Sequence, residues 1–146
     1  MRTVLVVVAG VLGLLMVGGG ITAVVMYQRA AAPDRSAPDV VVVNYLQSLL
    51  VARDQNRANL FTCGGRVVEI ESFRDQISAK EDELDVSISI NIENIVVVEA
   101  NSSSATVEAV IRRTAQVDGT QQSLTDGWRF KLSDQDGWRV CTAQPY

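Results

Sequence analysis

The first apolar run, residues 4–26, constrains this chain more than any other segment. It holds 23 residues without a charged side chain, and thirteen of them are valine, leucine or isoleucine. At ~1.5 Å per helical residue the run reaches about 34 Å, enough to cross a hydrocarbon layer of ~30 Å. The run therefore predicts one transmembrane helix within residues 1–28, with everything that follows tied to a membrane.

A cleaved signal peptide is the alternative interpretation of this segment. Arg2 supplies the basic start of such a peptide, and the alanines at 30–32 offer small residues for cleavage. Signal peptides have apolar regions of about 7 to 15 residues, and this run is longer. Arg29 also separates the run from the alanines. These features favour an uncleaved anchor, with a secreted soluble domain as the alternative.

The cysteines indicate which side of the membrane the domain occupies, because basic residues flank the apolar run on both sides. The only two, Cys63 and Cys141, both lie downstream of the run. An even number beyond an export segment indicates one disulfide in an oxidising compartment. Two buried free thiols are the alternative. We expect a single-pass plasma-membrane protein whose carboxy-terminal domain lies outside the cytoplasm.

Residues 29–39 are predicted to form a short tether stiffened by Pro33 and Pro38. Residues 40–146 then match the size of one domain. Asp39 is predicted to cap a helix over residues 40–53, because Val43, Leu46, Leu49 and Leu50 share one helical face. Further helices are expected over residues 54–62 and from Val67 to about Glu81.

The second half of the domain changes to the two-residue period of strands, with apolar and polar residues alternating from Leu84 to Ile92. Asp118 and Gly119 form a typical hairpin turn. Bulges are expected at residues 93–94 and 126–127. The predicted strands cover residues 84–92, 95–100, 106–117, 120–132 and 138–142. Helices followed by such a meander predict an α+β fold, with about three helices packed on one face of a curved antiparallel sheet.

Three segments together resemble a known family. They are the helix with VNYLQ at 43–47, the cysteine after the second helix, and the hairpin with GWRFKL at 127–132 and DGWRVC at 136–141. Over residues 40–144 they resemble nuclear transport factor 2-like, cystatin-like cone domains. More narrowly, they are similar to single-pass extracytoplasmic versions from actinobacteria, some associated with mammalian-cell-entry transport systems. The resemblance implies a cone around a pocket, with helices closing one side and a disulfide joining Cys63 to Cys141.

Five residues are the candidates to line such a pocket: Tyr45, Asp85, Arg112, Trp128 and Phe130. Arg112 and its neighbour Arg113 point to opposite faces of a strand, so only one of them can reach the pocket and hold an anionic ligand. A cross-strand pair with an acid is the preferred interpretation of this arginine. Trp128 and Phe130 have strand spacing and suit either the core or the pocket wall.

Composition excludes several kinds of site. The chain has no histidine, which rules out catalytic sites of the Ser-His-Asp and Cys-His kinds. Without histidine, two separated cysteines cannot form a usual zinc site. Gly64 and Gly65 lack the lysine that follows in a phosphate loop. From Ala30 onward the chain has eleven Arg and Lys residues and seventeen Asp and Glu residues. This net negative charge argues against nucleic acid as a binding partner. We expect no catalytic residue, cofactor or metal site, and interpret the acids at 81–85 as a solvated run.

The first functional hypothesis is therefore an accessory or binding module for a protein partner in the cell envelope or a transport system, or for a small apolar ligand. The alternative is a carboxylate-dependent isomerase or hydratase-like enzyme that uses Asp85. A deep pocket with an ionisable residue of raised pKa at its base would favour the enzyme. A filled cone with an exposed apolar patch would favour the binding module.

Overall fold

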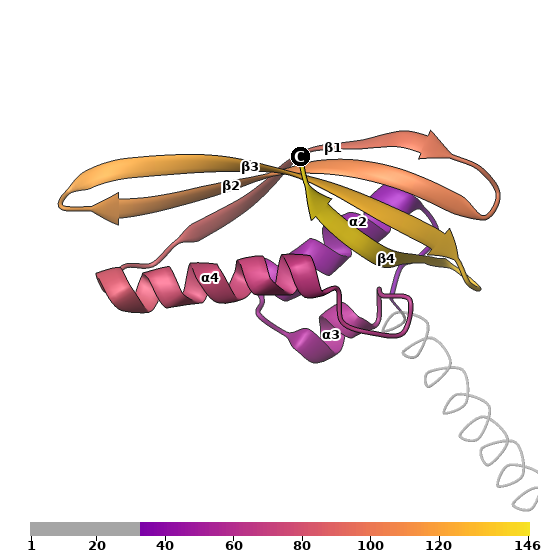
Figure 1. The fold of residues 1–146 in the computed structure, drawn as a ribbon, viewed down its shortest axis with the longest axis horizontal. Helices are drawn as coiled ribbons and strands as arrows, with labels where there is room; N and C mark the ends of the chain where they lie inside the picture. Colours follow the sequence, from indigo (N-terminus) through magenta and orange to yellow (C-terminus); the bar gives the residue numbers. More distant parts are fainter. Residues whose placement is uncertain (1–32) are drawn as a thin grey trace, which may run out of the picture. The chain divides into compact units, whose positions relative to one another are not determined.

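Four antiparallel strands form one curved sheet in the order β1-β2-β3-β4. The strands are β1 Ser89–Ala100, β2 Ser104–Val117, β3 Thr120–Asp134 and β4 Trp138–Pro145. The helices lie together on one side of the sheet (Figure 1). The computed structural model describes residues 33–146. This arrangement is the predicted α+β class and is consistent with a cone.

The first helical segment consists of two parts, α2 Pro38–Leu46 and a π-helix, η1 Gln47–Val51. The predicted cap at Asp39 is wrong, because the N-cap is Ala37 and Asp39 lies in the first turn. Pro38 explains the shift. Proline suits the first helical position, where no N–H partner is needed, and it holds the preceding residue in an extended conformation.

Two further helices follow, α3 Gln55–Asn59 and α4 Val68–Leu84. Asp54 caps α3 by accepting a hydrogen bond from the Arg57 N–H at 3.0 Å. The prediction of a strand from Leu84 is wrong, because α4 continues to that residue and β1 begins at Ser89. Asp85 ends the helix in a left-handed conformation with φ 50°.

The hairpins follow the sequence prediction closely. Asp118 and Gly119 both have positive φ, 51° and 76°, as the two-residue turn between β2 and β3 requires. The predicted bulge in β1 is confirmed, since the register with β2 shifts between Glu93 and Val96. Asn94 adopts φ 48° inside that bulge.

The second predicted bulge, at Asp126 and Gly127, is wrong. Both residues keep a continuous register with β2. Gly127 instead provides room for the Tyr146 ring, since a Cβ atom there would lie 2.9 Å from the ring Cζ. The glycine therefore marks a close approach of two segments, not a break in the ladder.

The interior between the helices and the sheet is filled with apolar side chains. The largest fully buried ones are Tyr45, Leu46 and Leu49 from the first helical segment, Ile70 from α4, and Ile111 and Phe130 from the sheet. Side chains from the helices and from the sheet therefore meet in one hydrophobic core.

The compact unit spans Asp34–Tyr146, so it begins ahead of the boundary expected at residue 40. The carbonyl oxygen of Arg35 accepts a hydrogen bond from the Trp138 N–H at 3.0 Å, which ties this stretch to β4. The transmembrane helix predicted for residues 4–26 lies outside the described residues. Within residues 33–146, no helix combines the length and apolarity needed to cross a membrane.

Candidate functional site

The five candidate pocket residues lie in three different environments. Tyr45 and Phe130 are fully buried in the core, and Trp128 is 4% exposed. Asp85 is exposed at the end of α4, and Arg112 lies partly exposed on β2. The structure therefore brings Tyr45, Trp128 and Phe130 into one core and leaves Asp85 and Arg112 outside it.

Both central arginines pair with acids across strands, as preferred from the sequence. Arg112 donates two hydrogen bonds to Glu93, at 2.9 and 3.1 Å. These bonds raise the pKa of Arg112 and lower the pKa of Glu93. Arg113 donates to Asp126 at 2.7 and 3.0 Å. Neither guanidinium is therefore a free anchor for an anionic ligand.

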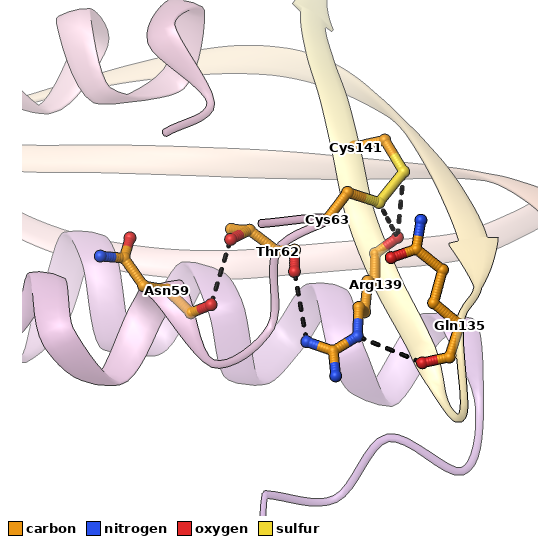
Figure 2. Close-up of a disulfide and its surroundings, with 6 residues drawn as sticks. All are labelled: Asn59, Thr62, Cys63, Gln135, Arg139 and Cys141. Atoms are coloured by element: carbon orange, nitrogen blue, oxygen red, sulfur yellow. Dashed lines mark hydrogen bonds between the residues drawn. A yellow bond between two sulfur atoms is a disulfide. The ribbon is translucent and has the colours of Figure 1, made fainter. Parts of the chain in front are cut away.

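The predicted disulfide between Cys63 and Cys141 is present and joins the segment after α3 to β4 (Figure 2). Backbone hydrogen bonds accompany it: the Cys63 N–H donates to the Val140 carbonyl at 2.9 Å, and the Val140 N–H donates to the Phe61 carbonyl at 2.8 Å. Figure 2 also shows Arg139 reaching the Thr62 carbonyl from β4. Residues 61–63 thus cover the outer edge of β4.

A surface groove lies elsewhere, between η1 and the opposite edge of the sheet at β1. It has a volume of about 510 Å³. Asn44 of α2, Gln47 and Ser48 of η1, and Asn91 of β1 give it a polar lining. The amide side chains of Asn44 and Gln47 make no hydrogen bond with another side chain or backbone group of residues 33–146. Their donors and acceptors are therefore available to a bound group.

The backbone beside this groove departs from regular geometry. The π-helix η1 forms one wall, and Arg53, two residues after its end, has φ 54°. Single π-turns inside helices are frequent at functional sites because they widen the helix locally. Sequence analysis missed the groove, since a π-turn has no sequence signature. Its one signal was Asn44 and Gln47, two polar residues three positions apart on an apolar helix.

Charge in the groove is positive. Arg57 is the one charged residue that lines it. The seven ion pairs among residues 33–146 do not include Arg57. Because the domain has a net negative charge, this lone cation gives the groove an electrostatic character distinct from the surface around it.

No carboxyl group among residues 33–146 has a clearly raised pKa, as a general acid would need. The carboxyl groups with a clear shift, those of Asp34, Glu81 and Glu93, all have a lowered pKa. Burial raises the pKa of Tyr45, and the nearby Glu71 carboxylate adds to the rise, so the phenol stays protonated. Within residues 33–146, no three histidine, cysteine or acidic side chains gather as metal ligands.

The buried carboxylate of Glu71 has a structural role. It accepts hydrogen bonds from the Val67 N–H at 3.1 Å and from the Gln55 side chain at 3.2 Å, and it pairs with Arg66. These contacts hold the start of α4 against α3. Both carboxylate oxygens of Glu71 therefore serve contacts within the domain.

No protein family model matches the chain, and no curated protein matches it. Among solved structures, the intermembrane space region of the chloroplast protein ARC6 is 15% identical, with a TM-score of 0.39, over 77% of this chain and 98% of that chain. A ketosteroid isomerase-like protein from Erwinia carotovora is 16% identical, with a TM-score of 0.45, over 73% of this chain and 89% of that chain. The beta subunit of the benzoate 1,2-dioxygenase from Burkholderia mallei is 13% identical, with a TM-score of 0.46, over 72% of this chain and 84% of that chain.

The last two structures have the cone fold of nuclear transport factor 2-like domains, the family that the sequence resembles. All three TM-scores lie below 0.5. The likeness therefore transfers neither an activity nor a partner to this chain.

Proposed function

We propose that this chain is a single-pass membrane protein whose extracytoplasmic cone domain is a non-catalytic binding module for a protein partner in the cell envelope. The observation that carries this proposal is the filled interior together with the open groove at β1. An enzyme of this architecture needs a pocket that takes substrate out of water, and this chain packs that space with Tyr45, Leu49 and Phe130.

The exposed end of β1 supports the same conclusion. Val96 and Val98 are 54% and 50% exposed, and Val97 between them is 38% exposed. Exposed valines on an edge strand offer apolar side chains that a partner can cover. The acidic balance of the domain argues against nucleic acid and anionic lipid as that partner.

Two features support the proposed location. A disulfide persists in an oxidising compartment, so Cys63–Cys141 suits a domain outside the cytoplasm. The apolar run at residues 4–26 is long enough to anchor the domain there. Carbonate extraction tests the anchor, since an uncleaved chain stays in the membrane pellet with its first residues intact. A soluble chain that starts after residue 32 would instead support secretion.

Co-purification tests the binding module. The full chain, cross-linked in native membranes and purified in mild detergent, is expected to bring one protein partner in stoichiometric amount. A variant with charged residues on the valine edge, Val96→Lys with Val98→Lys, is expected to lose it. The matched control is Lys131→Gln on β3. Turnover of a small molecule by the purified chain, with no partner recovered, would overturn the proposal.

A second candidate, binding of a small apolar ligand, rests on one observation. The Tyr45 hydroxyl and the Trp128 indole N–H are buried without a hydrogen-bond partner among residues 33–146. Trp128 and Phe73, whose rings lie 5.2 Å apart, line a second groove of about 480 Å³. A ligand with one acceptor oxygen would satisfy the indole. Trp128→Phe should then weaken the thermal stabilisation produced by an aromatic ketone such as benzophenone, and equal stabilisation of both proteins excludes this site.

A further inference from the structure

Only one edge of the sheet is open within residues 33–146. β4 lies at one edge, where Thr62 pairs with Val140 and the disulfide holds the segment in place. β1 lies at the other edge and has β2 as its single strand neighbour. An open strand edge offers a row of backbone donors and acceptors to another chain.

The turn between β2 and β3 fixes which backbone groups of β1 are free. Val117 and Thr120 flank this two-residue turn, so they exchange backbone hydrogen bonds with each other. Backbone groups point to alternate sides along a strand. Arg112, five positions before Val117, therefore points its N–H and C=O to β1, where it pairs with Asn91.

The same alternation continues along β1. Because Asn91 directs its backbone groups to β2, Ile90 and Ile92 direct theirs to the open edge. Their register is regular, since the first shift in β1 comes after Glu93. Residues 89–93 contain neither proline nor lysine, the residues that usually protect an edge. This stretch can therefore accept two or more ladder hydrogen bonds from an added strand.

The groove lies directly beside these two residues, since Ile90 and Ile92 line it together with Asn44 and Gln47. An added strand would place alternate side chains on the inner face of the sheet. Those side chains would enter the groove and meet its amides. The groove thus offers specificity to a strand whose affinity comes from backbone hydrogen bonds.

Arg57 decides the chemistry of the occupant. It is the one charged residue in the groove lining, and it takes part in none of the ion pairs among residues 33–146. An inward carboxylate on the added strand would complement it, whereas an inward lysine would be repelled. A second copy of this domain fits less well, since it brings the negative charge of the whole domain with it.

We propose that β1 accepts an extended acidic peptide segment of a partner protein as a fifth strand, with an inward carboxylate of that segment paired with Arg57 in the groove between η1 and β1. This rests on the proposed binding function and names the chemistry of its partner. The segment is proline-free over the residues that pair with Ile90 and Ile92, because each must supply backbone donors and acceptors.

Random eight-residue peptides displayed on phage test this proposal against the full chain in detergent. Enriched peptides should carry an aspartate or glutamate and lack proline in their central residues. Ile90→Pro should weaken binding of the enriched peptide about tenfold relative to Ile90→Ala, because both shorten the side chain and only proline removes the edge N–H. Arg57→Glu should weaken it about fivefold or more, whereas the charge change Lys131→Glu on β3 should leave it unchanged.

Hydrogen exchange of the full chain with the enriched peptide supplies a direct readout. The amides of Ile90 and Ile92 should become protected on binding, while that of Asn91 should be protected already in the free protein. Enrichment of basic peptides, equal binding by Ile90→Pro and Ile90→Ala, or protection of Asn91 alone overturns strand addition. If light scattering shows a dimer of the wild type and a monomer of Ile90→Pro, the edge of β1 binds a second copy of this chain. That result also overturns the proposal.

The two proposals can fail separately. A partner that co-purifies equally well with wild type, Ile90→Pro and Arg57→Glu leaves the binding module intact and removes strand addition at β1. Recovery of no partner at all, together with turnover of a small molecule, removes the binding module itself.

Discussion

Removal of the disulfide is the perturbation whose size follows most directly from the structure. Cys63 and Cys141 are separated by 78 positions. In the chain-entropy model, opening a loop of this length lowers the free energy of unfolding by about 4.5 kcal/mol, and measured values tend to be smaller. A domain of this size has a total stability of about 5–15 kcal/mol. We therefore expect Cys63→Ala with Cys141→Ala to lose about 3–4 kcal/mol.

Urea unfolding of the full chain in dodecyl maltoside, followed by tryptophan fluorescence, measures this loss. Wild type treated with a phosphine reductant is the matched control, because it opens the same loop without a substitution. The backbone hydrogen bonds of Val140 with Cys63 and with Phe61 do not depend on the sulfur atoms, so the folded state should keep them. A double variant within about 1 kcal/mol of oxidised wild type would refute the entropic reasoning.

Three other substitutions test the hydrophobic core, the close approach of Tyr146 to Gly127, and the carboxylate of Glu81. Phe130→Ala should lose about 3–5 kcal/mol of stability in the same urea assay, because Phe130 is fully buried; a loss below about 1 kcal/mol would contradict the filled interior. Gly127→Ala should displace the Tyr146 ring, seen as a change in its NMR ring-current shifts, and unchanged shifts would place the ring elsewhere. Burial alone would raise the pKa of Glu81, but hydrogen bonds from the Ile88 N–H and Arg53 lower this pKa below its usual 4.5. The stabilisation from Glu81 is therefore present above pH 4.5 and is lost as pH falls through the lowered pKa. Glu81→Gln should flatten the acid side of a plot of unfolding free energy against pH. An unchanged plot would contradict the role given to the Glu81 carboxylate.

Local patterns gave correct predictions where one interaction dominates the backbone. Asp118 and Gly119 predict the β2–β3 turn because few other residues adopt positive φ at two successive positions. The alternation in β1 from Ser89 onward survives in the structure, since a half-buried strand can keep only one face in contact with the core. The cross-strand partners of Arg112 and Arg113 were predictable in kind, because an arginine in mid-strand needs an acid nearby.

Two predictions failed because residues outside the local pattern decide the outcome. The alternation at Leu84 looks like a strand, but hydrogen bonds to the Glu81 side chain from Ile88 and Arg53 stabilise a longer α4 and a connecting segment before β1. Gly127 looks like a bulge, and only the position of Tyr146 shows why glycine is needed there. Neither Arg53 nor Tyr146 can be identified as a partner from the residues adjacent to Glu81 or Gly127 in sequence.

The α+β class, the hairpin turn, the disulfide and the absence of histidine chemistry can all be inferred from the amino-acid sequence, because each depends on composition or on a short period. The burial of Tyr45 and Phe130 in the core, and the position of Arg57 in a groove with Ile90 and Ile92, become visible in the folded domain alone. These facts depend on how helices settle on the sheet and on where a π-turn falls. Packing of residues far apart in sequence sets both, so no local pattern encodes them.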